Sequence, residues 1–262
     1  MLESRMPTGL TDLWQGLKRL PLAYWLASKD MKGRYARTVI GPFWSVLSNA
    51  IFVLVLGLTY GAIFGQRVSE FLPYLAVSMA FWQFINACLN EGPMLFQRSQ
   101  GLIMTYSLPL SVYAHRLAMD KLNMLLHFLA VYLVLCIVYP PHFNTQMFLV
   151  LPAFLIYYVF GVGAGLLLGV LGVRWRDVGQ AMSSLALLLF LITPIFWVKT
   201  PQLAAVADFN PFYHLLEVGR QPLRGMAPTN LNWIVAVCVS VGTLISGATA
   251  FVMGRRQVFY WL

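Results

Sequence analysis

Charge is scarce in this sequence. Only 10% of the 262 residues are Asp, Glu, Lys or Arg, whereas 59% are hydrophobic and the mean hydropathy is +0.71. Soluble domains carry roughly a quarter charged residues, so this composition excludes a soluble globular fold. The scarcity of charge also leaves long apolar runs, and about 20 apolar helical residues cross a hydrocarbon layer. The composition predicts a membrane protein with several spans.

Groups that carry out chemistry are also few. The three cysteines lie inside apolar runs and show no metal-ligand spacing. The nine Asp and Glu residues are scattered, and none lies at the middle of a run, where ion-coupled carriers generally hold carboxylates. The phosphate-binding sequence G-x-x-x-x-G-K-[ST] does not occur. We therefore predict no catalytic residue, no metal site and no bound cofactor, so that a partner must supply the energy for any uphill transport.

Six apolar runs are long enough to cross a membrane: 43–64, 71–90, 117–139, 147–172, 178–198 and 231–253. Lipid cannot satisfy free backbone polar groups, so these runs should be α-helices. They are too long and too evenly apolar for the alternating strands of a barrel. The sequence predicts one all-α membrane domain over residues 1–262, with six transmembrane helices and both termini on the same side.

The cations predict the orientation. Four of them crowd the stretch "KDMKGRYAR" (29–37), directly before the first apolar run. If the six runs span, fourteen of the eighteen Lys and Arg residues fall on the side of the termini, which the positive-inside rule places in the cytoplasm. The net charge of +9 therefore indicates contact with anionic lipid head groups, not with nucleic acid.

Residues 10–30 are expected to form an amphipathic helix at the membrane interface. Four apolar residues fall on one helical face: Leu10, Leu13, Trp14 and Leu17. Asp12 is expected on the polar face opposite to them. Pro21 should divide the segment into two helices, because a proline inside a helix removes a hydrogen bond.

Glycine recurs at four-residue spacing in two runs, at positions 57, 61 and 65 and at positions 161, 165 and 169. This spacing stacks the glycines on one helical face, where their missing side chains allow a close approach of another helix. A polar stripe begins the third run, with Arg116, Asp120, Asn123 and His127 on one face. We expect Arg116 to pair with Asp120 across one turn, although a water-filled path is the alternative.

Two links on the predicted cytoplasmic side have features of protein-binding surfaces. In residues 91–109, Met94, Leu95 and Phe96 should be exposed apolar contacts. In residues 173–180, Trp175 stands among charged residues, a composition typical of binding hot spots. The alternative for Trp175 is an anchor at the membrane interface.

The longest link, residues 199–230, lies on the opposite side. Its helical part begins at Asn210–Pro211 and is amphipathic but too short to span, with Glu217 and Arg220 three residues apart. An interfacial or re-entrant helix at the outer mouth is one interpretation, and a plain surface loop is the other.

Four stretches resemble the permease subunits of ATP-binding-cassette polysaccharide exporters: "RYARTVIGPFWSVL" (34–47), "VRWRDVGQ" (173–180), "TPIFW" (193–197) and "NPFYHLLEVGRQPLRG" (210–225). Each stretch is loose alone, but the four occur in the order of that family. The resemblance implies a homodimer of permeases with two copies of an ATPase subunit, which bind ATP and Mg²⁺. It implies export of a glycan linked to undecaprenyl pyrophosphate, with O antigen as the first expectation, through a bacterial inner membrane.

The same resemblance assigns roles to residues of this sequence. It implies ATPase-coupling contacts at Met94, Phe96, Arg98, Arg174, Trp175, Arg176 and Asp177. It implies an outer gate at Asn210, Pro211, Tyr213, Glu217 and Arg220. Two arginines sit where a lipid pyrophosphate could be received, Arg34 and Arg37, although they could serve the topology alone.

Aromatic residues in the spans could line a channel, because sugar rings stack on flat aromatic faces. The candidates are Tyr60, Phe81, Trp82, Phe84, Tyr157 and Phe190. Ordinary core packing or an interfacial belt is the alternative for each of them. Two other functions stay open: a permease for a drug or another lipid, and a membrane-embedded transferase, for which Asp120 with His127 would be the candidate site.

Overall fold

The structure is a computed structural model and describes residues 8–36, 38, 41, 43–140 and 144–262. Within these residues the ordered elements are helices. Five helical segments are long and apolar enough to cross a membrane. Their main helices are α3 (Phe43–Ile63), α4 (Val68–Glu91), α7 (Ser111–Val138), α8 (Val150–Arg174) and α12 (Asn230–Trp261). The predicted all-α membrane fold is confirmed.

The predicted fifth span is shorter than expected. Helix α9 (Val178–Ile192) has 15 residues, which is about 22 Å of helix and less than a hydrocarbon core. It ends at Ile192, and the backbone of the next residue, Thr193, is extended, because the residue before a proline is pushed out of the helical conformation. The bounds 178–198 were therefore wrong, and a sixth full span is not established.

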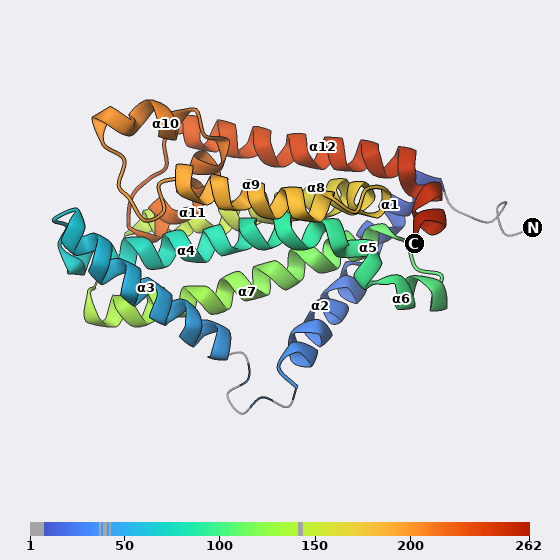
Figure 1. Ribbon diagram of the computed structural model, residues 1–262, viewed down its shortest axis with the longest axis horizontal. Coiled ribbons are helices and arrows are strands. Elements are labelled where there is room, and N and C mark those ends of the chain that lie inside the picture. Colours follow the sequence, from blue (N-terminus) through green and yellow to red (C-terminus); the bar gives the residue numbers. More distant parts are fainter. Residues whose placement is uncertain (1–7, 37, 39–40, 42, 141–143) are drawn as a thin grey trace, which may run out of the picture.

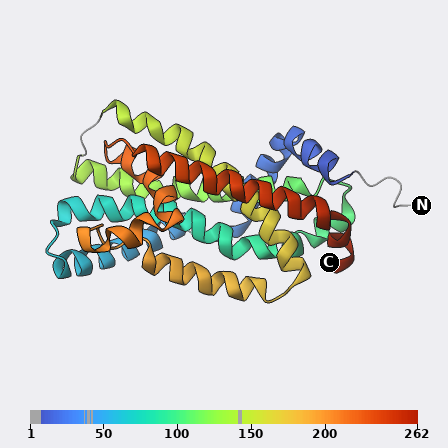
Figure 2. The same ribbon diagram turned by 90° about the horizontal axis from the view of Figure 1, so that it is seen from above.

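The short elements lie between the long ones: η2 (Gly92–Met94), α5 (Leu95–Arg98), α6 (Gln100–Thr105), η3 (Thr145–Leu149), η4 (Pro201–Leu203), α10 (Ala204–Asp208) and α11 (Pro211–Leu223). Figures 1 and 2 show the long helices running along one axis, with α1, α5, α6 and the C-terminus at one end and α10 at the other. We call these the C-terminal end and the α10 end. The two predicted coupling segments, residues 91–109 and 173–180, both lie at the C-terminal end, as predicted.

Helix α4 forms the centre of the bundle. Fifteen of its 24 residues are buried, and it packs against α3, α7, α8, α9 and α11. Helix α3 instead lies at the side of the bundle (Figure 1) and buries four of its 21 residues. The side of the molecule formed by α3 and α9 therefore exposes most of its side chains.

The glycine repeat of α8 packs as predicted. A Cβ atom at Gly161, Gly165 or Gly169 would lie 3.1, 3.2 or 2.9 Å from a side chain of α7 or α5. A closer contact of the same helix was not predicted and joins α8 to α12. A Cβ on Gly163 would lie 2.5 Å from the Leu244 nitrogen, and one on Gly247 would lie 2.4 Å from the Gly163 oxygen. Glycine at these two positions allows the two backbones to touch.

The repeat of α3 packs only in part. A Cβ on Gly57 would lie 2.2 Å from the side chain of Leu72, so this glycine does admit α4. Gly65 follows the end of α3 with φ +61°, and no atom lies within 4 Å of its Cβ position among the described residues. Its role is to form a turn, and the predicted third packing contact is wrong.

The N-terminal segment forms two helices, α1 (Gly9–Lys18) and α2 (Leu20–Arg34), with Pro21 in the first turn of the second. The predicted division is confirmed. The apolar residues Leu10 and Trp14 are exposed, as expected for a helix lying on lipid. Asp12, however, is fully buried, which corrects its expected place on a solvated face.

Candidate functional site

The two predicted coupling segments meet at the C-terminal end. They form a groove of about 400 Å³, lined by Met94 and Gln97 from the first segment, Arg176 and Gly179 from the second, and the C-terminal Leu262. We call this the C-terminal groove. It joins residues that are about 80 positions apart in the sequence, so the two segments form one surface.

Close backbone packing fixes this arrangement. A Cβ on Gly172 would lie 2.0 Å from the Pro93 oxygen, so only glycine lets η2 lie against the end of α8. The side chain of Gln97 also donates a hydrogen bond to the Gly172 oxygen at 3.1 Å. Gln100 donates a further one to the Leu262 oxygen at 2.8 Å. The groove is therefore held by one close backbone contact and by two hydrogen bonds from glutamine side chains to backbone oxygens.

Exposed aromatic and cationic side chains border the C-terminal groove. Trp175 is 50% exposed, and the guanidinium carbon of Arg174 lies 4.4 Å from the centre of its ring, a cation–π arrangement. Arg174, Arg176 and Asp177 are also exposed, as is Met94. These residues are accessible to a protein partner.

Two other predicted coupling residues are not free in this way. Phe96 is fully buried, because the absent side chain of Gly169 leaves room for its ring beside Phe251. The prediction that Phe96 is an exposed contact is wrong, and Leu95 is likewise buried. Arg98 is exposed but forms an ion pair with Glu91 at 2.9 Å.

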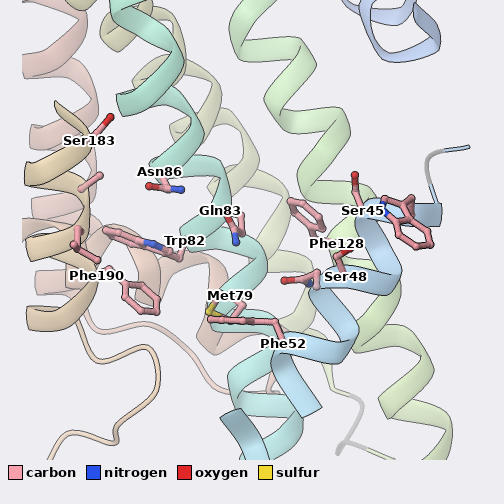
Figure 3. A pocket seen from close by; sticks show the side chains of 14 residues that line it. Ser45, Ser48, Phe52, Met79, Trp82, Gln83, Asn86, Phe128, Ser183 and Phe190 are labelled. Carbon is pink, nitrogen blue, oxygen red and sulfur yellow. The ribbon is translucent and has the colours of Figure 1, made fainter. Parts of the chain in front are cut away.

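A second cavity, of about 570 Å³, opens on the side of α3 and α9, with α4 at its base. We call it the α3–α9 cavity. Figure 3 shows Gln83 and Asn86 of α4 between Ser48 of α3 and Ser183 of α9, and these residues line the cavity. Sequence reasoning missed these polar residues, whose only signal was that they interrupt apolar runs.

The predicted channel aromatics separate into two groups. Trp82 and Phe190 line the α3–α9 cavity, with ring centres 5.8 Å apart. Phe81, Phe84 and Tyr157 are buried in the core, where the tyrosine ring lies 5.0 and 5.2 Å from the two phenylalanines. Phe81 and Phe84 lie on α4 and pack against Tyr157 of α8, so all three rings are core contacts in this structure, the alternative that the sequence left open.

The sixth aromatic candidate, Tyr60, lies nearer the α10 end of α3. Its ring packs 5.2 Å from Phe196, and it does not line the α3–α9 cavity.

The described ranges contain no group of potential metal ligands. Across them, no three His, Cys, Asp or Glu side chains are placed to hold a metal ion.

The polar stripe of α7 pairs with another helix. Arg116 forms two hydrogen bonds with Asp30 of α2, one of them 2.6 Å long, and Asp120 pairs with Arg34 of α2. The predicted Arg116–Asp120 pair is wrong, because α2 packs against α7 and offers a partner of opposite charge to each residue. Arg37, the second predicted pyrophosphate contact, lies outside the described residues.

Further ion pairs connect Asp120 to the first coupling segment, residues 91–109. Lys121 is fully buried and contacts Asp120 at 2.9 Å and Glu91, the last residue of α4, at 2.6 Å. Glu91 also binds Arg98 of α5. These charges therefore connect α2, α7, α4 and α5. The Nδ1 atom of His127 donates a hydrogen bond to the backbone oxygen of Asn123 in the same helix, at 2.7 Å.

Helix α11 is buried against α4, α8 and α12, which rules out a plain surface loop over its length. Asn210 begins it by accepting a hydrogen bond from the Phe212 nitrogen at 2.9 Å, and Pro211 occupies the first helical position. Tyr213 is buried as well. The start of this helix follows the sequence signals closely.

A buried arginine joins α11 to α4. Arg220 pairs with Glu217 and donates hydrogen bonds to the Pro194 oxygen at 2.7 Å and to Ser78 at 3.0 Å. Burial alone would lower the pKa of Arg220, but the Glu217 carboxylate favours the charged form and the pKa is raised. Of the five predicted gate residues, Pro211 is exposed and the other four are buried in this structure.

Residues 21–223 match the protein family described as "ABC-2 type transporter". The chain belongs to this family. Among its relatives are two proteins named O-antigen export system permease protein RfbA. The one from Myxococcus xanthus is 23% identical over 174 residues, which are 66% of each chain, just under two thirds. The one from Klebsiella pneumoniae is 21% identical over 196 residues, or 73% of this chain and 75% of that protein.

Membership of the ABC-2 family confirms the predicted class, a multi-pass membrane subunit of a transporter. The matched residues contain α2, except for its first residue, and the elements from α3 to α11. They therefore include most of the C-terminal groove and all of the α3–α9 cavity. Both places are consequently parts of the ABC-2 membrane domain itself.

Proposed function

We propose that this chain is the transmembrane subunit of an ATP-driven exporter that moves lipid-linked O antigen across the bacterial inner membrane. The observation that carries the proposal is the meeting of the two coupling segments in one exposed groove of an ABC-2 membrane domain. We infer the substrate, O antigen, from the names of the two RfbA relatives. The uncharged polar lining of the α3–α9 cavity favours a glycan over an apolar drug.

An ATPase subunit would dock on the C-terminal groove. The sequence has no phosphate-binding loop, so ATP and Mg²⁺ would be bound by two copies of this partner. The C-terminal end would then face the cytoplasm, in agreement with the excess of cations that the sequence places there. Within that frame α1 is an interfacial helix, and α10 and α11 form the re-entrant segment at the outer mouth.

A second copy of the chain would cover the side formed by α3 and α9. Polar residues such as Ser48 and Gln83 open on that side, where lipid would leave them without hydrogen-bond partners. A homodimer built there would enclose the path of the glycan between its subunits. Arg34 stays a proposed contact for the pyrophosphate, although it pairs with Asp120 in this structure.

The transferase alternative loses support. Asp120 is bound by Arg34 and Lys121, and His127 bonds to the backbone of its own helix. Asp120 is thus already paired with two cations, and no hydrogen bond joins it to His127 among the described residues, so a transport subunit accounts better for both.

Docking is tested with Trp175→Ala and Asp177→Arg. Each should weaken co-purification with the ATPase, Trp175→Ala by about 30-fold, which corresponds to the roughly 2 kcal/mol lost at a hot spot. Trp25→Ala is the matched control, because Trp25 is similarly exposed and also lies beside a cation, Lys29. Unchanged co-purification of both variants, Trp175→Ala and Asp177→Arg, would overturn the docking site. In a separate measurement, ATP hydrolysis by the purified chain alone would overturn the proposal that only the partner hydrolyses ATP.

A further inference from the structure

Helices α1 and α2 each bury one stripe of small residues against the bundle. A Cβ atom on Gly9 would lie 2.7 Å from the backbone of α12, and one on Gly16 would lie 2.1 Å from a side chain of α7. On α2 the buried positions are Ala23 and Ala27, and this helix packs against α7. Figure 1 shows both helices beside the C-terminal end, with α2 running obliquely to the long helices. One face of each helix is therefore used for packing, and the opposite face is exposed.

The faces that pack on the bundle also contain both acidic residues of the two helices, Asp12 and Asp30. Arg255 of α12 donates a hydrogen bond to Asp12 at 2.7 Å. Arg116 of α7 donates two hydrogen bonds to Asp30, one of them 2.6 Å long. An arginine of the bundle thus neutralises each carboxylate. Within residues 9–34, the exposed faces consequently carry no unpaired negative charge.

The exposed faces repeat one arrangement of tryptophan and lysine. Trp14 of α1 and Trp25 of α2 are 59% and 55% exposed. The Nζ atom of Lys18 lies 5.0 Å from the centre of the Trp14 ring, and that of Lys29 lies 5.4 Å from the centre of the Trp25 ring. Both are cation–π distances. In each helix the lysine follows the tryptophan by four residues, so the same pair occurs twice, on neighbouring helices.

The positive charge of this surface is not cancelled within the described chain. Each lysine has a second exposed cation within one turn, Arg19 or Lys32, and none of the four pairs with a carboxylate among the described residues. Lys199 at the α10 end differs in this respect. It lies 5.4 Å from the ring of Tyr213, but it also pairs with Asp208 at 2.5 Å. The exposed faces of α1 and α2 can therefore accept an anion from outside the chain.

Apolar side chains on the same surface indicate the kind of anion. Leu10 and Leu17 lie one turn from Trp14 on either side and are 69% and 47% exposed. A small soluble anion would leave these leucines in water. An interfacial helix instead buries its apolar face about 5–10 Å deep, at the boundary between head groups and acyl chains. A phospholipid surface thus fits both the cations and the leucines.

The structure assigns to the exposed faces of α1 and α2 the binding of anionic phospholipid head groups. Lys18 and Lys29 each bind a phosphate, and the tryptophan beside each lysine lies at the level of the head groups. Selectivity follows from the internal pairing of Asp12 and Asp30, because an exposed carboxylate would attract the cation of a zwitterionic lipid. A helix that was only amphipathic would lie equally well on a zwitterionic bilayer. The inference goes beyond the proposed function, since it depends neither on the cargo nor on the ATPase.

Quenching of a fluorophore by brominated lipids measures this selectivity. A chain whose three cysteines are replaced by alanine and that carries Gln15→Cys is labelled with bimane and placed in lipid nanodiscs. Gln15 is exposed on α1, next to Trp14. Brominated phosphatidylglycerol should bind near this label more than about fivefold better than brominated phosphatidylcholine, because each nearby cation contributes roughly that factor. The same label at Ile245→Cys, exposed on α12, should show no preference.

A variant of one lysine tests the assigned contact. Lys18→Gln should lower the preference at Gln15 about fivefold, and its thermal unfolding temperature should be unchanged because Lys18 is exposed. Lys199→Gln is the matched control and should leave the preference as it is. This lysine also lies beside an aromatic ring, but its charge is already paired with Asp208.

Three results would overturn the inference. The first is equal quenching by the two lipids in the chain with the native Lys18, and the second is an unchanged preference in Lys18→Gln. The third is loss of the preference when the ATPase subunit binds, because the cations would then contact an acidic protein surface. A chain that selects phosphatidylglycerol but neither binds an ATPase nor exports glycan would refute the proposed function and support this inference.

Discussion

At the scale of single residues, buried charges fix how the short helices join the bundle. The Asp12 carboxylate accepts hydrogen bonds from the backbone nitrogens of Leu110 at 3.1 Å and Ser111 at 3.0 Å, at the start of α7. It also accepts one from Arg255 of α12 at 2.7 Å. A carboxylate at a helix N-terminus satisfies free N–H groups and the positive end of the helix dipole. One residue thus ties α1 to two transmembrane helices.

We expect Asp12→Ala to destabilise the protein strongly. It would leave the buried Arg255 guanidinium without its partner, and breaking a buried ion pair in this way costs about 3–5 kcal/mol. Thermal unfolding of the detergent-solubilised protein measures the effect. Glu70→Ala removes a carboxylate from an exposed, 3.8 Å pair with Arg67 and should change the stability by less than about 1 kcal/mol. Equal effects of the two substitutions would contradict this account of Asp12.

At the scale of elements, the packing of α8 against α12 depends on glycines that no repeat announces. Gly163 and Gly247 bring the two backbones into contact, whereas the predicted repeat of α8 faces α7 and α5. The four-residue spacing identified a helical face that packs closely. It did not identify the second, closer contact on another face of the same helix.

We expect Gly247→Ala to separate α12 from α8, because its Cβ would lie 2.4 Å from a backbone oxygen that cannot move aside. Overpacking of this kind costs about 1–3 kcal/mol, measurable as a lower unfolding temperature. Gly242→Ala is the matched control on the same helix, with no atom within 4 Å of its Cβ position in the described structure. It should be neutral or slightly stabilising, since alanine favours helix more than glycine does. If both variants lose stability alike, the contact does not limit packing.

At the scale of the whole molecule, the two ends of the bundle should face opposite sides of the membrane. The C-terminal groove lies at one end, and η4 and α10 lie at the other (Figure 1). In the proposed exporter, this separation would allow an ATPase at the C-terminal end to act on a path that opens at the α10 end.

A cysteine-labelling experiment tests the orientation. In a cysteine-free chain in intact cells, a membrane-impermeant maleimide should label Gln202→Cys at the α10 end and leave Arg176→Cys unlabelled, although both positions are exposed. Arg176→Cys should react once the membrane is permeabilised. Labelling of Arg176→Cys from outside would reverse the orientation and remove the proposed docking site from the cytoplasm.

The sequence by itself determined the fold class, the starts of several helices and the segment proposed to contact the ATPase. Long uncharged runs allow only helices in lipid, Pro21 divides the N-terminal segment, and Asn210–Pro211 starts α11 because capping and proline effects are local. Trp175 could be recognised in the same way, since no core position suits a tryptophan between two arginines.

Only the tertiary structure decided which residues face one another. Phe81 and Trp82 are neighbours in sequence, but one faces the core and the other the α3–α9 cavity. Arg116 and Asp120 suit each other across one turn, yet each pairs with a residue of α2. The physical reason is that an apolar residue of a membrane helix can face either lipid or the protein interior. Hydropathy therefore does not distinguish the inner face of the helix from the outer one.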